Sequence, residues 1–227
     1  MKIGIIAAMA QEMNILKESI ENVTLDNVLG VEFYKGIIGK NEVVLSLCGV
    51  GKVNASMSTT ILINNYDCDL IINTGIAGGL SSLKPKDVVL ANSLMYHDFD
   101  TTIFGYDYGQ VPSMPKLFVP KEEALSIVRN ALKELNIAYN EGLIYSGDQF
   151  VSSLDALKNV GYENALAVEM EGAAIAHVCV KANKNFIVIR YISDIIGVES
   201  QINDYLSFED EMARRSSKIT LELMNKI

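Results

Sequence analysis

The chain has 227 residues, of which 49% are hydrophobic, and its 28 acidic residues outnumber its 19 lysines and arginines to give a net charge of -9. This balance argues against a nucleic-acid partner, because a protein that binds a phosphate backbone needs clustered basic residues. The length favours one domain over residues 1–227, and no repeat or linker divides the sequence.

The three cysteines form an odd number without C-x-x-C spacing, which indicates neither a disulfide framework nor a zinc site. No apolar run approaches the roughly 18 residues that span a bilayer. Residues 3–10 are apolar, but Gln11 and Glu12 follow without the cleavage context of a signal peptide. We therefore expect a cytoplasmic protein without a membrane segment, whose thiols are small buried residues: Cys48, Cys68 and Cys179.

Short aliphatic runs that end in glycine or polar residues recur along the chain and are typical of strands buried on both faces. An antiparallel hairpin is expected where two such runs flank the turn at residues 39–41. In chain order, the predicted strands are residues 2–8, 31–38, 42–47, 70–73, 87–91, 142–145, 166–168 and 186–192.

Amphipathic stretches lie between these runs and predict helices. The clearest is residues 122–136, where apolar residues recur at helical spacing. The last helix is expected to begin near Ser207, with Asp210 in a capping box. Together the elements predict an α/β fold with a mixed, mostly parallel sheet between layers of helices.

Residues 98–120 interrupt this alternation. They hold three of the four prolines and five of the 17 aromatic residues. A structureless stretch of this length is usually functional or disordered, and its aromatic content argues against disorder. We expect this loop to form a wall of a ligand site or a subunit contact; the alternative is a loop packed on its own side chains.

Carboxylates follow several of the predicted strands. Ligands of α/β sheets bind beyond the carboxyl ends of the strands, and Glu12, Glu171 and Asp194 all come after such ends. One acid at such a place is more often a helix cap or a surface charge. Three acids gathered in one crevice repel each other unless they are needed there, so together they predict an acidic site.

Two glycine-rich segments follow strands without completing a nucleotide-binding motif. The segment at residues 49–52 is followed by Val53 at the position where a Walker loop needs Ser or Thr. Asn54 stands at the position where a dinucleotide fingerprint needs its third glycine. Residues 75–79 are similar. We interpret both segments as tight turns whose main chain can approach a ligand closely.

The only two histidines offer too little context for a catalytic metal or a Ser-His pair. His177 lies in an apolar helical stretch and is interpreted as structural. His97, beside the long loop, either contacts a ligand or braces the loop.

Six segments at strand ends and in the long loop share one order along nearly the whole chain: Lys2-Ile-Gly-Ile-Ile with Met9 and Glu12, Ile72-Asn-Thr-Gly, Phe104-Gly-Tyr-Asp-Tyr-Gly-Gln, Ser146-Gly-Asp-Gln-Phe150, Val168-Glu-Met-Glu171 and Arg190-Tyr-Ile-Ser-Asp194. In this order they resemble the 5'-methylthioadenosine/S-adenosylhomocysteine nucleosidase family. The resemblance implies a nucleoside phosphorylase-like fold, which is a single-domain three-layer α/β/α sandwich around a mixed central β-sheet. It also implies a homodimer.

The resemblance implies hydrolysis of the N-glycosidic bond of 5'-methylthioadenosine, S-adenosylhomocysteine and 5'-deoxyadenosine, with release of adenine and a 5-substituted ribose and without a metal or organic cofactor. The expected place of the reaction is methionine salvage and removal of a methyl-cycle by-product. Such cleavage builds positive charge on the ribose and negative charge on the leaving base. By the family match, Asp194 donates a proton to N7 of adenine, Glu12 activates water with the help of Arg190, and Glu171 accepts the ribose hydroxyls.

The family match also assigns the substrate contacts. Phe150 would stack on adenine while the backbone of Val151 contacts its edge, and the backbones of Met170 and Ile76 would lie near the ribose. Part of the long loop would come from the neighbouring subunit. The pocket for the 5'-alkylthio group would be lined by Met9, Val50, Phe104, Tyr106, Pro112 and Phe208.

Four departures from the family pattern bear on substrate preference and leave the acids in place. Ile76 stands where serine is common, Ala10 and Gln11 stand where acids are common, and Tyr191 replaces a small residue. Residues 195–206 form a segment a few residues longer than in typical members.

Three other functions stay open at this point. A purine nucleoside phosphorylase needs a cationic phosphate cradle, which Glu12 beside the single cation Arg190 opposes. A hydrolase of aminofutalosine-type nucleosides would use the same acids. A non-catalytic nucleoside-binding or sensing protein would have no need of a proton donor beside the leaving group.

Overall fold

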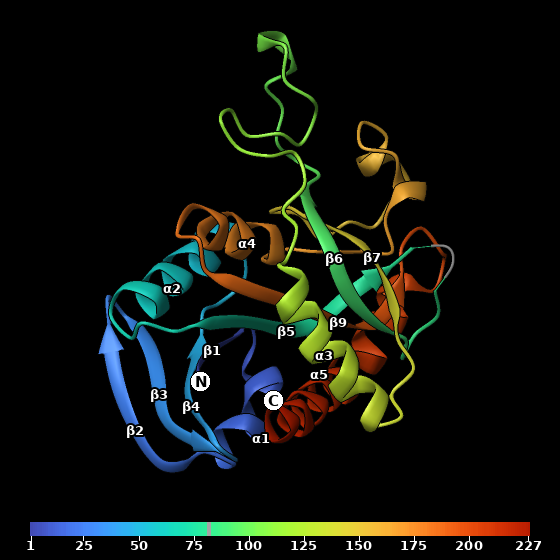
Figure 1. Cartoon of the computed structure of the whole chain (residues 1–227). Helices are drawn as coiled ribbons and strands as arrows, with labels where there is room; N and C mark the ends of the chain where they lie inside the picture. The colour runs from blue at the N-terminus through green and yellow to red at the C-terminus, as the bar shows by residue number, and fades with distance from the viewer. Residues whose placement is uncertain (81–82) are drawn as a thin grey trace.

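The computed structural model describes residues 1–80 and 83–227. Within this part, nine strands form one mixed sheet in the order β2-β3-β4-β1-β5-β8-β7-β6-β9, and β9 also pairs with β5 (Figure 1). The strands are β1 (Lys2–Ala7), β2 (Glu21–Val28), β3 (Val31–Ile38), β4 (Asn41–Leu47), β5 (Leu70–Gly79), β6 (Val88–Tyr96), β7 (Asn140–Ser146), β8 (Ala167–Glu169) and β9 (Asn185–Ile195).

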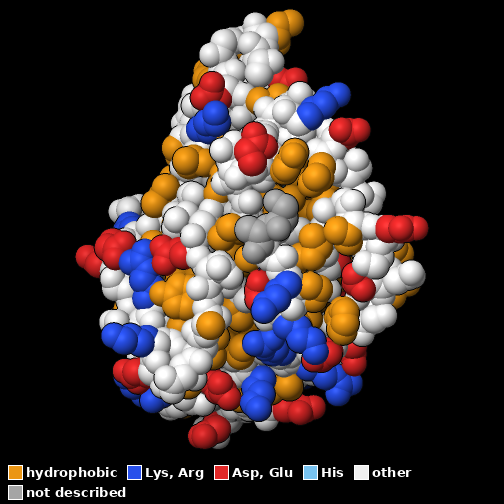
Figure 2. Space-filling view, turned by 90° about the vertical axis from the view of Figure 1, so that its right-hand side faces the viewer, with side chains coloured by type: hydrophobic (Ala, Val, Ile, Leu, Met, Phe, Trp, Pro, Cys, Tyr) orange, Lys and Arg blue, Asp and Glu red, His pale blue; other side chains and the backbone are white. Residues whose placement is uncertain are grey.

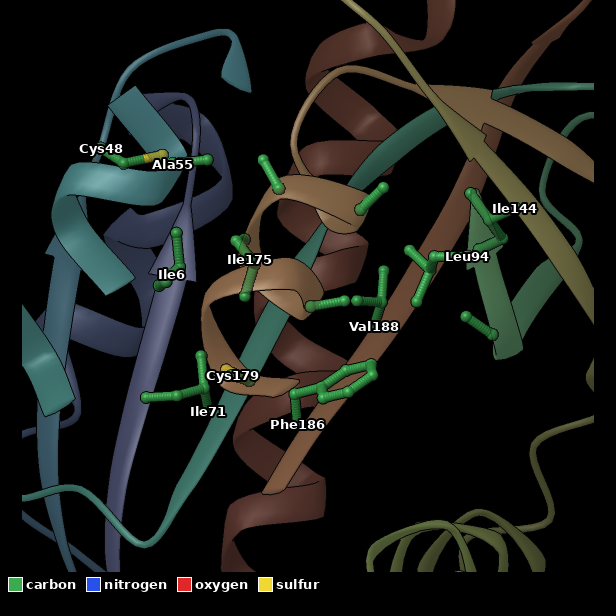
Figure 3. Packing of buried hydrophobic residues seen from close by; sticks show 14 of the residues in the cluster. Ile6, Cys48, Ala55, Ile71, Leu94, Ile144, Ile175, Cys179, Phe186 and Val188 are labelled. Atoms are coloured by element: carbon green, nitrogen blue, oxygen red, sulfur yellow. The ribbon is translucent and has the colours of Figure 1, made fainter. Parts of the chain in front are cut away.

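Helices cover both faces of this sheet, as the sequence predicted. They are α1 (Ala10–Glu18), α2 (Lys52–Asn64), α3 (Glu122–Glu134), α4 (Gly172–Lys181) and α5 (Gln201–Lys226). Helices α2 and α4 pack on one face, where Ile6, Ile71, Ile175 and Val188 belong to a single apolar cluster (Figure 3). Helices α1, α3 and α5 pack on the other face, over a second cluster. The predicted layered α/β fold is therefore confirmed.

The predicted hairpin is present as β3 and β4, which pair antiparallel from Phe33 opposite Ser46 to Ile38 opposite Asn41. The helix predicted over residues 122–136 is α3. All three cysteines are buried and free, as expected. No helix in the described part of the chain combines the length and apolar character needed to cross a membrane.

Three element predictions were wrong or incomplete. Strand β5 does not stop at Asn73 but continues to Gly79, so residues 75–79 are strand and not a turn. Helix α5 begins at Gln201 rather than near Ser207, and Asp210 lies inside it, paired with Arg214 at 3.1 Å instead of capping. Strand β2 was missed, because nearly all of its side chains are exposed and it shows no apolar alternation.

The sheet folds back on itself at one end. Strand β9 pairs parallel with β5 and antiparallel with β6. The carboxyl ends of β5 and β9 therefore lie side by side, and the segments that follow β1, β4, β7 and β8 converge on the same region.

The middle of residues 98–120 projects from the body as a long loop with a single turn of 3-10 helix at Thr102–Phe104 (Figure 1), whereas Phe118 near its end is buried and bridges to Leu94 of β6. On the face shown in Figure 2 the loop forms the narrow projection, and basic side chains lie among acidic ones. Ile103 at the tip is 88% exposed and Phe104 is 77% exposed. Apolar side chains this exposed are unusual for a loop packed on itself, which favours the predicted contact role.

Candidate active site

A pocket of about 660 Å³, including the open space at its mouth, lies at the carboxyl ends of β5 and β9. This volume suits a small organic ligand. The three acids predicted from strand ends, Glu12, Glu171 and Asp194, all line it. Each is nearly fully buried, with at most 6% of its surface exposed.

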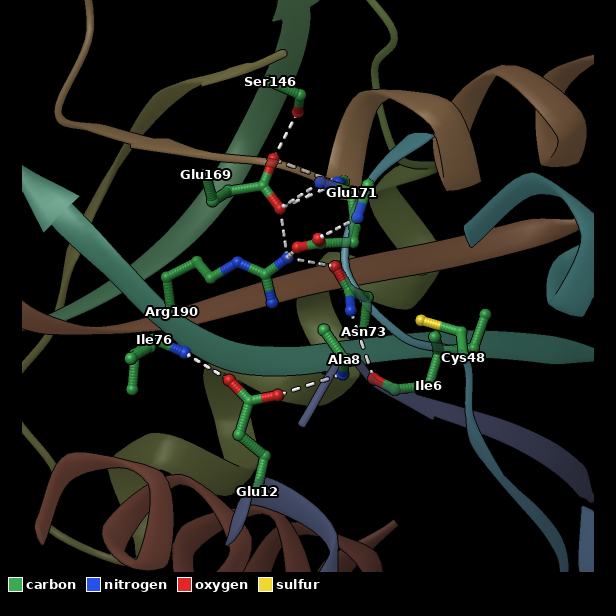
Figure 4. A network of polar contacts seen from close by, with 12 residues as sticks. Ile6, Ala8, Glu12, Cys48, Asn73, Ile76, Ser146, Glu169, Glu171 and Arg190 are labelled. Carbon is green, nitrogen blue, oxygen red and sulfur yellow. Dashed lines mark hydrogen bonds and ion pairs between the residues drawn. The ribbon is translucent and has the colours of Figure 1, made fainter. Parts of the chain in front are cut away.

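Main-chain amides fix the Glu12 carboxylate at the start of α1. Its Oε2 accepts the amides of Ala8 and Met9, each at 3.0 Å, and its Oε1 accepts the amide of Ile76 at 3.0 Å (Figure 4). Burial raises the pKa of Glu12, and the charge of Arg190 and these three amides oppose that rise. The Ile76 amide therefore serves the site although the family's serine hydroxyl is absent.

Gly75 allows Glu12 to lie against β5. A Cβ atom at this position would be 2.6 Å from Oε1 of Glu12 and 3.1 Å from a guanidinium nitrogen of Arg190. Any side chain at this position would displace the acid. The glycines after Thr74 therefore allow a charged side chain to pack closely against a strand. They do not form the tight turn that the sequence suggested.

A bulge in β9 turns Asp194 into the pocket. Ala77 pairs with Ile192 but Gly78 pairs with Asp194, so Ser193 is the extra residue. Successive strand residues normally point to opposite faces. Here Ser193 and Asp194 both line the pocket, because the bulge interrupts that alternation.

Two uncharged side chains hold the Asp194 carboxyl. Ser193 Oγ donates to Oδ1 at 2.6 Å, and Gln201 Nε2 donates to Oδ2 at 2.9 Å. Burial raises the pKa of Asp194, and these two hydrogen bonds partly oppose that rise. A carboxyl in this state holds its proton at a higher pH than a solvated aspartate does.

A buried ionic network supports Glu171 (Figure 4). Oε1 of Glu171 accepts the amide of Gly51 at 2.8 Å, and Oε2 lies 3.8 Å from Arg190. Gly51 has a φ of 101°, which confirms the tight turn predicted between β4 and α2. Burial, reinforced by the neighbouring Glu169, raises the pKa of Glu171 to about 7.

Arg190 is 1% exposed and pairs with acids instead of lining the pocket. Its guanidinium donates to Glu169 and to Asn73. Glu169 also accepts the amides of Glu171 and Gly172, at distances of 2.8 to 3.0 Å, so it anchors the start of α4. The structure places Arg190 among the buried acids, and the help in holding the attacking water that the family resemblance implied stays a prediction.

Aromatic and apolar side chains form the rest of the pocket. Phe150 is 52% exposed and packs edge-on against Tyr205 of α5, with ring centroids 5.2 Å apart. The predicted site residues that line the pocket are Met9, Glu12, Val50, Ile76, Phe150, Val151, Met170, Glu171 and Asp194.

Four predicted residues for the alkylthio end do not line this pocket. Phe208 was expected there, but its ring instead lies 5.4 Å from the Lys86 ammonium. Helix α5 starts earlier than predicted, and Tyr205 is its aromatic residue in the pocket. Phe104, Tyr106 and Pro112 are exposed on the long loop, so their contact with substrate stays a prediction that requires a second copy of the chain.

Sequence reasoning missed several pocket residues. Glu169 and Ser193 stand inside or beside segments that the sequence had singled out, so their positions were a usable signal. Gln201 and Tyr205 are spaced i, i+4 and would have shared a face had the helix start been placed correctly. The lining residues missed are Ala8, Ala77, Gly78, Gln149, Val168, Glu169, Ser193, Ile196, Gln201 and Tyr205.

The two histidines lie outside the pocket lining. His177 Nδ1 is 3.2 Å from the hydroxyl of Tyr96 and its ring stacks on Phe118, which confirms a structural role. His97 is buried at the base of the long loop, and its amide donates to Ser146 at 3.0 Å. Of the two roles predicted for His97, ligand contact and support of the long loop, the structure favours support of the loop.

Tyr191, a departure from the family pattern, is fully buried in the apolar cluster beneath α1, α3 and α5. It therefore does not line the pocket. Across the residues that the structure describes, no group of three or more His, Cys, Asp or Glu side chains is arranged to hold a metal ion.

Known proteins resemble this chain over nearly its whole length. A family model described as the phosphorylase superfamily matches residues 2–225. A 5'-methylthioadenosine/S-adenosylhomocysteine nucleosidase of Bacillus cytotoxicus is 40% identical over 231 residues and covers 100% of both chains. The structure of an S-adenosylhomocysteine nucleosidase of Streptococcus pyogenes in complex with 5-methylthiotubericidin has a TM-score of 0.93 at 39% identity, covering 100% of this chain and 97% of that one. A native structure of futalosine hydrolase of Helicobacter pylori has a TM-score of 0.92 at 31% identity, covering 100% and 98%.

The raised pKa of Glu171 predicts how stability depends on pH. The folded chain holds this proton up to about pH 7, whereas an unfolded glutamate loses it near 4.5. Between these values the folded state binds more protons than the unfolded state, so the free energy of unfolding falls as pH rises. We expect Glu171→Gln, which does not titrate, to reduce this fall, measured by urea denaturation from about pH 4.5 to about pH 7.

Glu163→Gln, at an exposed position, is the matched control and should keep the slope of the wild type. Equal slopes for Glu171→Gln and the wild type would contradict the assigned cause.

Proposed function

The chain belongs to the 5'-methylthioadenosine/S-adenosylhomocysteine nucleosidases of the phosphorylase superfamily, and on that basis we propose a role for each acid in its pocket. The protein hydrolyses the N-glycosidic bond of these nucleosides, releasing adenine and a 5-substituted ribose. The observation that carries the proposed roles is the gathering of three buried acids in one pocket. The place of the reaction in methionine salvage and methyl-cycle by-product removal is part of the proposal.

Asp194 is the proposed general acid. Cleavage leaves negative charge on adenine, and a proton delivered to N7 neutralises it. A donor must hold its proton near the working pH, which an ordinary aspartate does not. The burial of Asp194, with only the uncharged Ser193 and Gln201 bonded to its carboxyl, supports this role.

Glu12 is the proposed general base for the attacking water. Its carboxylate is held by three main-chain amides and faces the same pocket as Asp194. Amide donors and the charge of Arg190 favour the ionised form, which a base requires. Arg190, whose charge acts on Glu12 from among the buried acids, is proposed to help hold this water.

Glu171 is the proposed partner of the ribose hydroxyls. Its carboxylate is fixed by Gly51 and Arg190, so it can accept hydrogen bonds without reorienting. Above its pKa of about 7, its negative charge also favours the positive charge that develops on the ribose. The hydrogen bonds to the ribose hydroxyls and the attraction between opposite charges both strengthen as the bond between ribose and base breaks.

Phe150 and Tyr205 are suited to hold the purine ring, since both aromatic side chains line the pocket and pack against each other. The backbone of Val151 is proposed to contact the edge of adenine, and Met9 and Val50 to border the 5' substituent. A homodimer is also proposed, in which the projecting loop of residues 98–120 brings Phe104, Tyr106 and Pro112 to the neighbour's pocket. Support comes from the exposure of these residues in the single chain.

The rival functions fit the pocket less well. Phosphorolysis requires cations that face the phosphate, and none of the described residues that line this pocket is basic. A futalosine-type hydrolase would use the same acids, and the structural likeness to such an enzyme keeps this substrate class as the second candidate. A binding protein would not need three buried acids, whose desolvation opposes ionisation.

The proposed substrate class can be tested with 5'-methylthioadenosine, S-adenosylhomocysteine, 5'-deoxyadenosine, aminofutalosine and inosine, following release of the base. We expect adenine from the first three, at equal rates with and without added inorganic phosphate. Strict dependence on phosphate would show a phosphorylase, and selective cleavage of aminofutalosine would favour the second candidate.

Replacing the proposed acid tests its role. We expect Asp194→Asn to lower kcat/KM for 5'-methylthioadenosine by ~100 to 10,000-fold, because an amide cannot supply the acid proton. The fold should persist, since an asparagine side chain can still accept from Gln201 and donate to Ser193. Asp155→Asn, on an exposed turn, is the control. If the Asp194→Asn variant kept the turnover of the wild type, Asp194 would not be the general acid.

Glu12→Gln separates catalysis from binding. We expect hydrolysis to be lost because glutamine cannot take a proton from water, while a stable substrate analogue still binds in calorimetry. One of the amides now held by the carboxylate would face an NH2 group, so unfolding should be measured in parallel. If the variant stays folded but no longer binds the analogue, Glu12 is a binding residue instead of a base.

A further inference from the structure

Gln201 is a buried polar side chain that has no proposed role of its own. It is the first residue of α5, is 3% exposed and lines the pocket. Its amide nitrogen donates to Asp194 Oδ2 and to the carbonyl of Val151, both at 2.9 Å. Its carbonyl oxygen accepts the amide of Gly197 at 3.0 Å. The side chain therefore has both donor hydrogens and its acceptor engaged.

These bonds join parts of the chain that have no other polar link. Asp194 belongs to β9, whereas Val151 follows β7. Across the described residues, no other hydrogen bond connects Val151 to β9 or α5. The amide of Gln201 is thus the polar link that sets the segment after β7 relative to the acid, beside the packing of Phe150 on Tyr205 and of Val151 in one apolar cluster with Ile196.

We propose that Gln201 is a positioning residue that holds the carboxyl of Asp194 and the carbonyl of Val151 at a fixed separation, so that both address the same purine ring. This inference rests on the proposed function, which gives the acid and the backbone their contacts with the base. It adds a residue of α5 to the machinery that orients the leaving group.

Fixed orientation matters because proton transfer is sensitive to small displacements. Catalytic groups have to be held within a fraction of an ångström, and side chains locked by further hydrogen bonds achieve this. Gln201 is itself locked by Gly197 of the loop between β9 and α5. A hydrogen bond donated to Asp194 also stabilises its ionised form, so Gln201 limits how far burial raises the pKa of this acid.

Gln201 lies in a segment of the chain that departs from the family pattern. Residues 195–206 are the segment that the sequence indicated to be longer than usual for the family. In the structure, this segment forms the loop after β9 and the first turn of α5, which brings Gln201 over the acid. The longer segment therefore acts at the base end of the pocket.

Two substitutions separate the donor role from space filling. Gln201→Glu keeps the shape and can still accept from Gly197, but it presents oxygen atoms to Asp194 and Val151. Gln201→Leu removes all three hydrogen bonds at similar volume. Asn203→Ala, which removes an exposed amide two residues along the same helix, is the matched control. The readouts are kcat and KM for 5'-methylthioadenosine, the pH profile of kcat/KM, and the thermal midpoint.

Both Gln201 variants are expected to lose about tenfold or more in kcat/KM, the effect of losing a hydrogen bond to a charged group. The alkaline limb of the kcat/KM profile should move to higher pH, because Asp194 loses a donor to its ionised form and holds its proton longer. A merely structural role lowers activity without moving this limb. Asn203→Ala should match the wild type in every readout.

The proposal is overturned if both folded variants keep the alkaline limb of the wild type. It is also overturned if KM falls below the wild-type value, since the amide would then compete with the base for Val151 and Asp194. If Gln201→Leu does not fold, Gln201→Glu decides alone. Wild-type protein that releases no adenine would refute the proposed function instead, so the two failures are distinguishable.

Discussion

The pocket depends on the parallel pairing of β5 with β9. This pairing sets Gly75 opposite Arg190 and Gly78 opposite Asp194. The same strand end provides the Ile76 amide that holds Glu12. Two carboxylates and one guanidinium are thereby fixed by strand register, which is stiffer than loop geometry. The bulge at Ser193 is the one irregularity, and it is what turns the Asp194 side chain into the pocket.

The sequence predicted the layers of the fold because most strands are continuous aliphatic runs buried on both sides, as β1 and β9 show. The prediction from sequence failed where a strand lacks a continuous aliphatic run. Strand β2 has almost no buried side chain, and the second half of β5 is rich in glycine. The glycine at position 75 is required by a carboxylate that is remote in sequence, so no local pattern could distinguish this strand from a turn.

The acids of the site were found from strand ends and from ordered motifs, whereas some of their supports, such as Glu169, Ser193 and Gln201, were not. Gln201 is polar and buried, which reverses the usual assignment of polar residues to the surface. Arg190 belonged to a recognised segment, yet only the fold shows that its guanidinium meets Glu169 and Asn73. Residues of the projecting loop are not among the described residues that line the pocket of one chain, and a single sequence carries no information on where a second copy binds.

The environments of Glu12 and Asp194 differ in what opposes the effect of burial on the pKa, and this difference supports the proposed roles of base and acid. Glu12 receives three main-chain amides and lies in the field of Arg190, all of which favour its ionised form. Asp194 receives only neutral side chains, and the nearby Asp204 favours its protonated form. Burial raises the pKa of both carboxyl groups, and the cation that opposes this rise lies on the side of Glu12. The side chains on Asp194, unlike the amides on Glu12, can be replaced without altering the backbone, so the strength of the acid is the property that sequence changes in α5 can tune.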